Sequence, residues 1–86
     1  MSEALKEWLE NPHWKKYYEE APSDQCREYI ALEFRYSDTE DEDIAEEMDA
    51  LLETLSAEDL RHLAAYAGNT PQRAALLKRA EEMEKR

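Results

Sequence analysis

The chain has 86 residues, one cysteine, one glycine and a net charge of −11. These features exclude an internal disulfide, a zinc site built from cysteines and a glycine-rich phosphate loop. They also argue against general affinity for nucleic acid or anionic membranes, which repel a polyanion.

The composition predicts an all-α fold. Ala, Leu, Glu, Lys and Arg dominate, whereas valine is absent and isoleucine occurs only twice, so helix formers are abundant and strand formers scarce. The length fits a single domain, residues 1–86. We therefore expect a small compact bundle of four to five short helices. Nothing resembles a signal peptide or a membrane span, so the expected location is the cytoplasm.

Two short helices are predicted at the start of the chain. Ser2 can cap the first, which should end near Glu10 because a proline inside a helix costs about 3 kcal/mol. Asn11 as cap and Pro12 as first residue then begin the second. A single kinked helix is the alternative.

A third helix is predicted from a cap at Ser23 to about Tyr36, followed by a polar connector over 37–40. Cys26 lies one turn before Ile30 on this helix. The thiol is therefore expected to be a small buried side chain.

The segment 37–59 combines an apolar stripe at helical spacing with eleven acids and no base. The stripe consists of Ile44, Met48, Leu51, Leu52 and Leu55. The acids are Asp38, Glu40, Asp41, Glu42, Asp43, Glu46, Glu47, Asp49, Glu53, Glu58 and Asp59. Such spacing predicts a helix, capped by Thr39 or Asp41 and ending around Leu55. We expect the rest of the chain to pack against its apolar side, and its carboxylates to face water unpaired.

The last third predicts a helical hairpin. Ser56 and Asp59 have the spacing of a capping box, and Gly68 suits the left-handed end of a helix. The Thr-Pro pair at 70–71 then starts the final helix, of which residues 81–86 are expected to fray.

An alternative for 56–86 is a DNA-binding helix-turn-helix, since the turn is short and contains glycine. The second helix would contribute Arg73, Lys78 and Arg79. The negative charge of the whole chain favours a plain αα-hairpin instead.

The predicted core draws on every one of these helices. It consists of Leu5, Trp8, Leu9, Trp14, Ile30, Phe34, Ile44, Met48, Leu51, Leu52, Leu55, Leu60, Leu63, Ala64, Leu77 and Ala80.

Four aromatic residues crowd the first eighteen positions, and not all of them fit one small core. Tyr17 and Tyr18 point about 100° apart on a helix, so one of the pair should lie at the boundary or on the surface. Exposed Trp and Tyr are typical interface anchors, and filling of the core is the equal alternative. Trp14 and Tyr18 are the candidate partner contacts.

No combination of residues predicts an enzyme, a cofactor site or a metal site. Alternate acids from Asp38 onwards begin a calcium-loop pattern, but Asp43 stands where such a loop needs glycine and Asp49 where it needs glutamate. His13 and His62 each lack a second histidine four residues on.

The leading hypothesis is a non-catalytic interaction or regulatory module that binds a basic protein surface through its acidic helix. The candidate partner-binding residues are Asp41, Glu42, Asp43, Glu46 and Glu47, with Trp14 and Tyr18. The alternative is a nucleic-acid mimic that inhibits a nucleic-acid-binding protein, because regularly spaced carboxylates can imitate phosphates. The helix-turn-helix over 56–86 is the further alternative.

Overall fold

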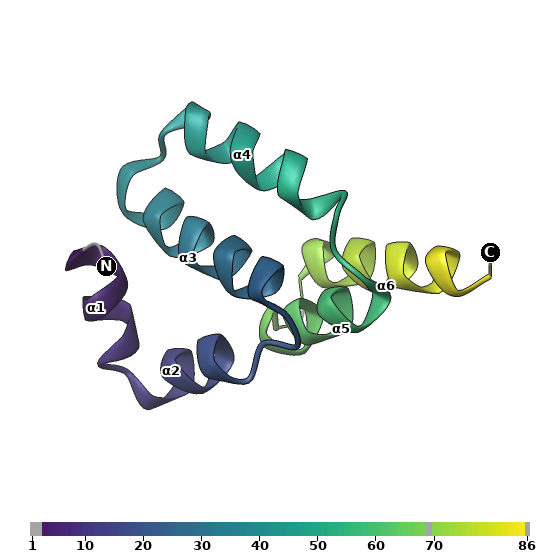
Figure 1. Ribbon diagram of the computed structural model, residues 1–86, viewed down its shortest axis with the longest axis horizontal. Helices are drawn as coiled ribbons and strands as arrows, with labels where there is room; N and C mark the ends of the chain where they lie inside the picture. Colours follow the sequence, from purple (N-terminus) through teal and green to yellow (C-terminus); the bar gives the residue numbers. More distant parts are fainter. Residues whose placement is uncertain (1–2, 69, 86) are drawn as a thin grey trace. The chain divides into compact units, whose positions relative to one another are not determined.

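The computed structural model of the protein describes residues 3–68 and 70–85. This part of the chain forms six helices and no strand (Figure 1). They are α1 (Glu3–Leu9), α2 (Pro12–Glu19), α3 (Asp24–Thr39), α4 (Glu42–Leu52), α5 (Ala57–Tyr66) and α6 (Pro71–Glu84). The all-α prediction is confirmed.

The described residues form six helices, one more than the four to five expected, and the first break separates two helices as predicted instead of kinking one. Asn11 caps α2, and its side chain accepts a hydrogen bond of 3.0 Å from the backbone N–H of His13. Pro12 is the first residue of α2. The cap satisfies one of the N–H groups that a new helix leaves without a partner.

The chain divides into two units, Met1–Thr54 and Leu55–Arg86. The first contains α1 to α4, and the second α5 and α6. Their charges differ: the first has seventeen acids against five bases, net −12, whereas the second is net +1. The single domain over 1–86 stays a prediction.

In the first unit, α3 is the helix around which the others pack. It contacts α1, α2 and α4, and Figure 1 shows it between α4 on one side and α1 and α2 on the other. The expectation that the chain packs around the apolar side of 44–55 is wrong for this unit. Ile44 is buried, but Met48, Leu51 and Leu52 are only half-buried, because α4 lies along α3 at one side of the unit.

Phe34 lies at the centre of an aromatic cluster in this core. It is 2% exposed and stacks in parallel on Trp8, with 4.8 Å between the ring centroids. Trp14 and Tyr17 approach it edge to face at 6.0 and 6.2 Å. Phe34 was predicted to be buried and is, whereas Trp8, Trp14 and Leu9 are half-buried at the margin of the cluster.

Helix α3 is longer than predicted. It continues through Thr39, so 37–40 is not a free connector. The Ser37 hydroxyl donates to the backbone carbonyl of Glu33 at 3.1 Å, and the Thr39 hydroxyl to that of Arg35 at 2.9 Å. In both bonds a hydroxyl donates to the carbonyl four residues earlier, so these two side chains are engaged by the helix itself. Glu40 ends the helix in the left-handed region, with φ 53°.

Helix α4 is shorter than predicted, because it ends at Leu52 rather than near Leu55. The Thr54 hydroxyl donates to the carbonyl of Leu51 at 2.7 Å and so satisfies one acceptor of the last turn. Leu55 is 1% exposed and belongs to the second unit.

The second unit confirms the predicted capping box. The Asp59 N–H donates to Ser56 Oγ at 3.2 Å, and the Ser56 N–H donates to Asp59 Oδ2 at 3.0 Å. Asp59 is 3% exposed, so its carboxylate does not face water as expected. Gly68 adopts φ 71°, as predicted.

Helices α5 and α6 pack against each other. Leu60, Leu63, Ala64 and Ala80 are buried as predicted, together with Leu76. Leu77 was expected in the core but is 40% exposed, since it lies about 100° round the helix from Leu76. Helix α6 runs through Glu84, which forms an ion pair with Arg61; the fraying expected for 81–86 stays a prediction, and residue 86 lies outside the described residues.

Candidate functional site

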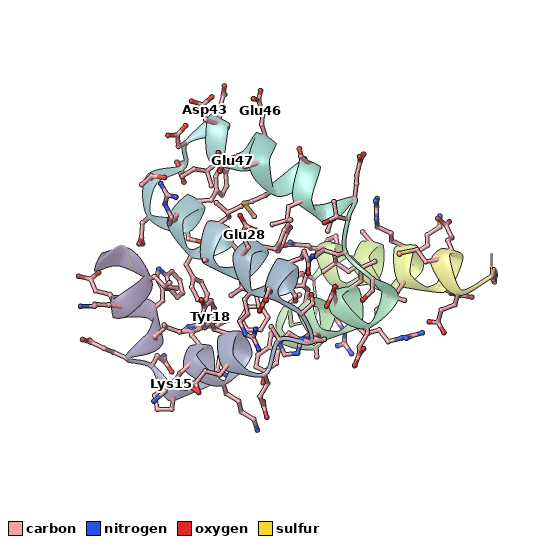
Figure 2. The ribbon with its side chains drawn as sticks, viewed as in Figure 1. Lys15, Tyr18, Glu28, Asp43, Glu46 and Glu47 are labelled. Carbon is pink, nitrogen blue, oxygen red and sulfur yellow. The ribbon has the colours of Figure 1, made fainter. Side chains whose placement is uncertain are left out.

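The acidic side of α4 contains all five predicted acidic contact residues. Asp41 is the N-cap, and its side chain accepts from the Asp43 N–H at 2.9 Å. Glu42 and Asp43 occupy the first turn, where negative charge interacts favourably with the helix dipole. Glu46 and Glu47 lie one turn further on. All five side chains are exposed, and Figure 2 shows Asp43 and Glu46 extending away from α3.

The charge of α4 is not neutralised by a cation of its own unit among the residues that the structure describes there. The ion pairs of this part are Lys15–Glu19 at 3.8 Å on α2 and Arg27–Asp24 at 2.6 Å on α3. Neither involves α4. Asp41 caps the helix, and the carboxylates of Glu42, Asp43, Glu46 and Glu47 therefore interact with solvent and with one another.

The structure does not bring the two aromatic candidates to the acidic side. Trp14 and Tyr18 lie on α2, and α3 separates that helix from α4 within the unit (Figure 1). Trp14 packs edge to face against Trp8, with 5.6 Å between the ring centroids. Both candidates are half-buried, whereas Tyr17 is 2% exposed. The prediction that one tyrosine of the pair lies at the boundary is confirmed.

A groove runs between α3 and α4. It has a volume of about 420 Å³ and is lined by Glu28, Leu32, Glu47, Ala50 and Leu51. Leu32 is buried and Leu51 half-buried, while both glutamates and Ala50 are exposed. Figure 2 labels Glu28 on α3 and Glu47 on the neighbouring stretch of α4. The groove thus has an apolar floor and a carboxylate on each wall.

Glu28 and Ala50 were not among the contact residues predicted from the sequence. A signal was present, because each helix has a glutamate four residues before a leucine, at Glu28 and Leu32 and again at Glu47 and Leu51. Residues four apart share one face of a helix. Only the packing of α3 on α4 reveals that these two faces border the same groove.

A second, smaller hollow of about 320 Å³ lies beside α1 and α2. It is lined by Glu7, Trp8, Asn11, Trp14 and Asp38. The indole N–H of Trp8 donates to Asp38 Oδ2 at 3.3 Å, and the Trp8 ring stacks on Phe34. The indole N–H and one face of the Trp8 ring are therefore in contact with other residues of the protein. Asp38, unlike the acids of α4, accepts a side-chain hydrogen bond from Trp8.

Glu33, unlike the acids of α4, lies largely inside the first unit. Glu33 accepts a hydrogen bond of 3.2 Å from the Tyr17 hydroxyl. Burial raises the pKa of Glu33, and the bond from Tyr17 opposes that shift. Burial and the nearby Glu33 raise the pKa of Tyr17 as well, and burial together with Glu33 and Asp49 raises the pKa of Tyr29 to about 12. Tyr17 and Tyr29 therefore stay neutral at physiological pH.

Within residues 3–68 and 70–85, no three His, Cys, Asp or Glu side chains are grouped so as to hold a metal ion. None of the helices described has the length and apolarity needed to cross a membrane. No family model, curated protein sequence or solved structure matches the chain.

Proposed function

We propose that the protein is a non-catalytic interaction module that binds a basic surface of another protein through the acidic side of α4. The observation that carries the proposal is the set of exposed carboxylates on α4, with no ion pair to the described cations of its own unit. A cationic partner is the simplest ligand for this surface, because complementary charge speeds encounter and fixes orientation.

The acids of α4 also act against the stability of the helix that carries them. Glu42 and Glu46 are four residues apart, as are Asp43 and Glu47, and each such like-charge pair destabilises a helix by about 0.2–0.5 kcal/mol. The helix dipole favours acids in the first turn only. Folding alone therefore does not account for Glu46 and Glu47, which supports a role in binding.

The proposal includes a cytoplasmic location. Its support is that the chain has a single cysteine, Cys26, whose side chain is fully buried. A chain with one cysteine gains no internal disulfide from an oxidising compartment.

Affinity capture from the source cell tests the proposal. The bait is the wild-type chain, compared with Glu46→Lys/Glu47→Lys and with a control of equal charge change, Glu10→Lys/Glu20→Lys, at the exposed residues that follow α1 and α2. We expect a basic partner that the α4 variant loses and the control retains. Binding should also fall at about 1 M salt, where the Debye length is about 3 Å.

A partner that both variants retain, or whose binding does not depend on salt, would refute the proposal. Addition of duplex DNA to the captured complex tests the alternative that the protein is a nucleic-acid mimic. Release of the partner by DNA identifies it as a nucleic-acid-binding protein whose site α4 occupies.

A further inference from the structure

We infer that the groove between α3 and α4 is the docking site for a basic amphipathic helix of the partner. The inference rests on the proposed function and extends it, because it specifies which part of the acidic surface makes contact and what the partner must present. The occupant is a helix with an apolar stripe and Lys or Arg beside that stripe.

The form of the groove follows from the way its two helices are joined. Only Glu40 and Asp41 separate α3 from α4, so the two helices form an antiparallel αα-hairpin (Figure 1). Residue order therefore reverses from one wall to the other. Glu28 and Leu51 lie towards one end of the groove, and Leu32 and Glu47 towards the other.

The floor of the groove requires an apolar ligand. Leu32, Ala50 and Leu51 line a space of about 420 Å³, near the lower end of the range of about 300–1,000 Å³ over which binding pockets occur. That space takes a few side chains rather than a folded domain. Furrows between two helices commonly bind the apolar face of a third, whose anchors recur every three or four residues.

The walls of the groove require a cationic ligand. An apolar helix without cations would cover Glu28 and Glu47 without pairing them, and a buried unpaired carboxylate is costly. Lys or Arg on both sides of the apolar stripe would pair with these two acids, which lie at opposite ends and on opposite walls. The net charge of −12 on this unit attracts such a helix and repels an acidic one.

Two synthetic peptides test the inference. The first is an 18-residue amphipathic helix of Leu and Lys with Leu at positions i, i+3, i+4 and i+7, and the second has the same composition in scrambled order. Fluorescence anisotropy measures the binding of each labelled peptide to the full chain. We expect the amphipathic peptide to bind at least about tenfold more tightly, a difference of about 1.4 kcal/mol.

Three variants locate the contact. Ala50→Trp fills the groove without changing charge, at an exposed helix position that tolerates a large side chain. Glu28→Gln/Glu47→Gln removes two charges from the groove, and Asp43→Asn/Glu46→Gln removes two charges from the side that extends away from α3. We expect the first two variants to abolish most of the preference for the amphipathic peptide and the third to retain it. Circular dichroism confirms that each variant is folded.

The outcomes separate this inference from the proposed function. Equal binding of both peptides, or an undiminished preference in Ala50→Trp and Glu28→Gln/Glu47→Gln, overturns the groove as the docking site. If the outward pair Asp43→Asn/Glu46→Gln alone weakens binding, the acidic helix still binds the partner but the groove does not. If neither charge variant nor salt changes binding, the proposed function fails as well.

Discussion

Reversing the charge of Glu46 and Glu47 should make the protein more stable while abolishing its binding to a basic partner. Both side chains are exposed on α4, and neither has an ion pair within the described part of its unit. The double variant Glu46→Lys/Glu47→Lys therefore breaks no described structural contact. It changes the interactions of these positions with the acids one turn earlier.

The magnitude follows from the spacing of the charges. Glu42 lies four residues before position 46, and Asp43 four residues before position 47. Each reversal replaces a repulsion of about 0.2–0.5 kcal/mol with an attraction of similar size, in the favourable order with the acid first. The gain is about 0.4–1 kcal/mol for each pair and about 0.8–2 kcal/mol for the double variant. The melting temperature should rise by about 4–8 °C for each kcal/mol.

Tryptophan fluorescence is the appropriate probe because the two tryptophans of the chain, Trp8 and Trp14, both lie in the first unit with α4. Urea unfolding followed at this signal gives the stability of that unit. Wild type should become more stable as salt screens the acidic repulsion, and the double variant should respond less. A variant less stable than wild type would refute the reasoning, since it would mean that these carboxylates make stabilising contacts.

Three further predictions concern single residues. Burial raises the pKa of Glu33 in the folded protein above the ordinary value of 4.5. The protonated Glu33 side chain therefore contributes to stability below pH 4.5, and this contribution is lost as the pH rises through the pKa of the folded state. Glu33→Gln should therefore unfold at higher urea than wild type at pH 7, with the difference vanishing at low pH; a difference independent of pH would contradict this. Glu40 has φ 53°, so Glu40→Gly should be about 1 kcal/mol more stable than Glu40→Ala, which keeps the left-handed strain without the charge; equal stability in thermal melts would count against strain at this cap. Leu76→Ala should cost about 2–5 kcal/mol because Leu76 is 6% exposed, and Leu77→Ala should stay within about 0.5 kcal/mol. Circular dichroism melts compare the stabilities of Leu76→Ala and Leu77→Ala directly. Equal losses of stability in these two variants would show that the burial pattern of α6 is wrong.

The sequence by itself determined the all-α class and most helix beginnings. These depend on local chemistry. The Asn11 and Ser23 side chains accept hydrogen bonds from N–H groups in the first turn of the helices that they cap, and Ser56 and Asp59 form a capping box. Gly68 adopts the left-handed conformation that favours glycine. The partners in each of these features lie within a few residues, so spacing in the sequence specifies them. The exposed acids of α4 were predictable for the same reason, because polar positions opposite an apolar stripe face solvent.

The tertiary structure alone decided which helix the first unit packs around, which face of α6 is buried, and where the groove lies. The apolar spacing of 44–55 was the clearest in the sequence, yet α3 contacts three helices because it is long and carries buried side chains from Cys26 to Phe34. Leu76 and Leu77 are alike in the sequence, and only the position of α5 distinguishes them. Glu28 and Glu47 are nineteen residues apart. They border one groove because the connection at Glu40 and Asp41 folds α4 back along α3. The spacing within each helix marks a face, but no period in the sequence shows that the two faces meet.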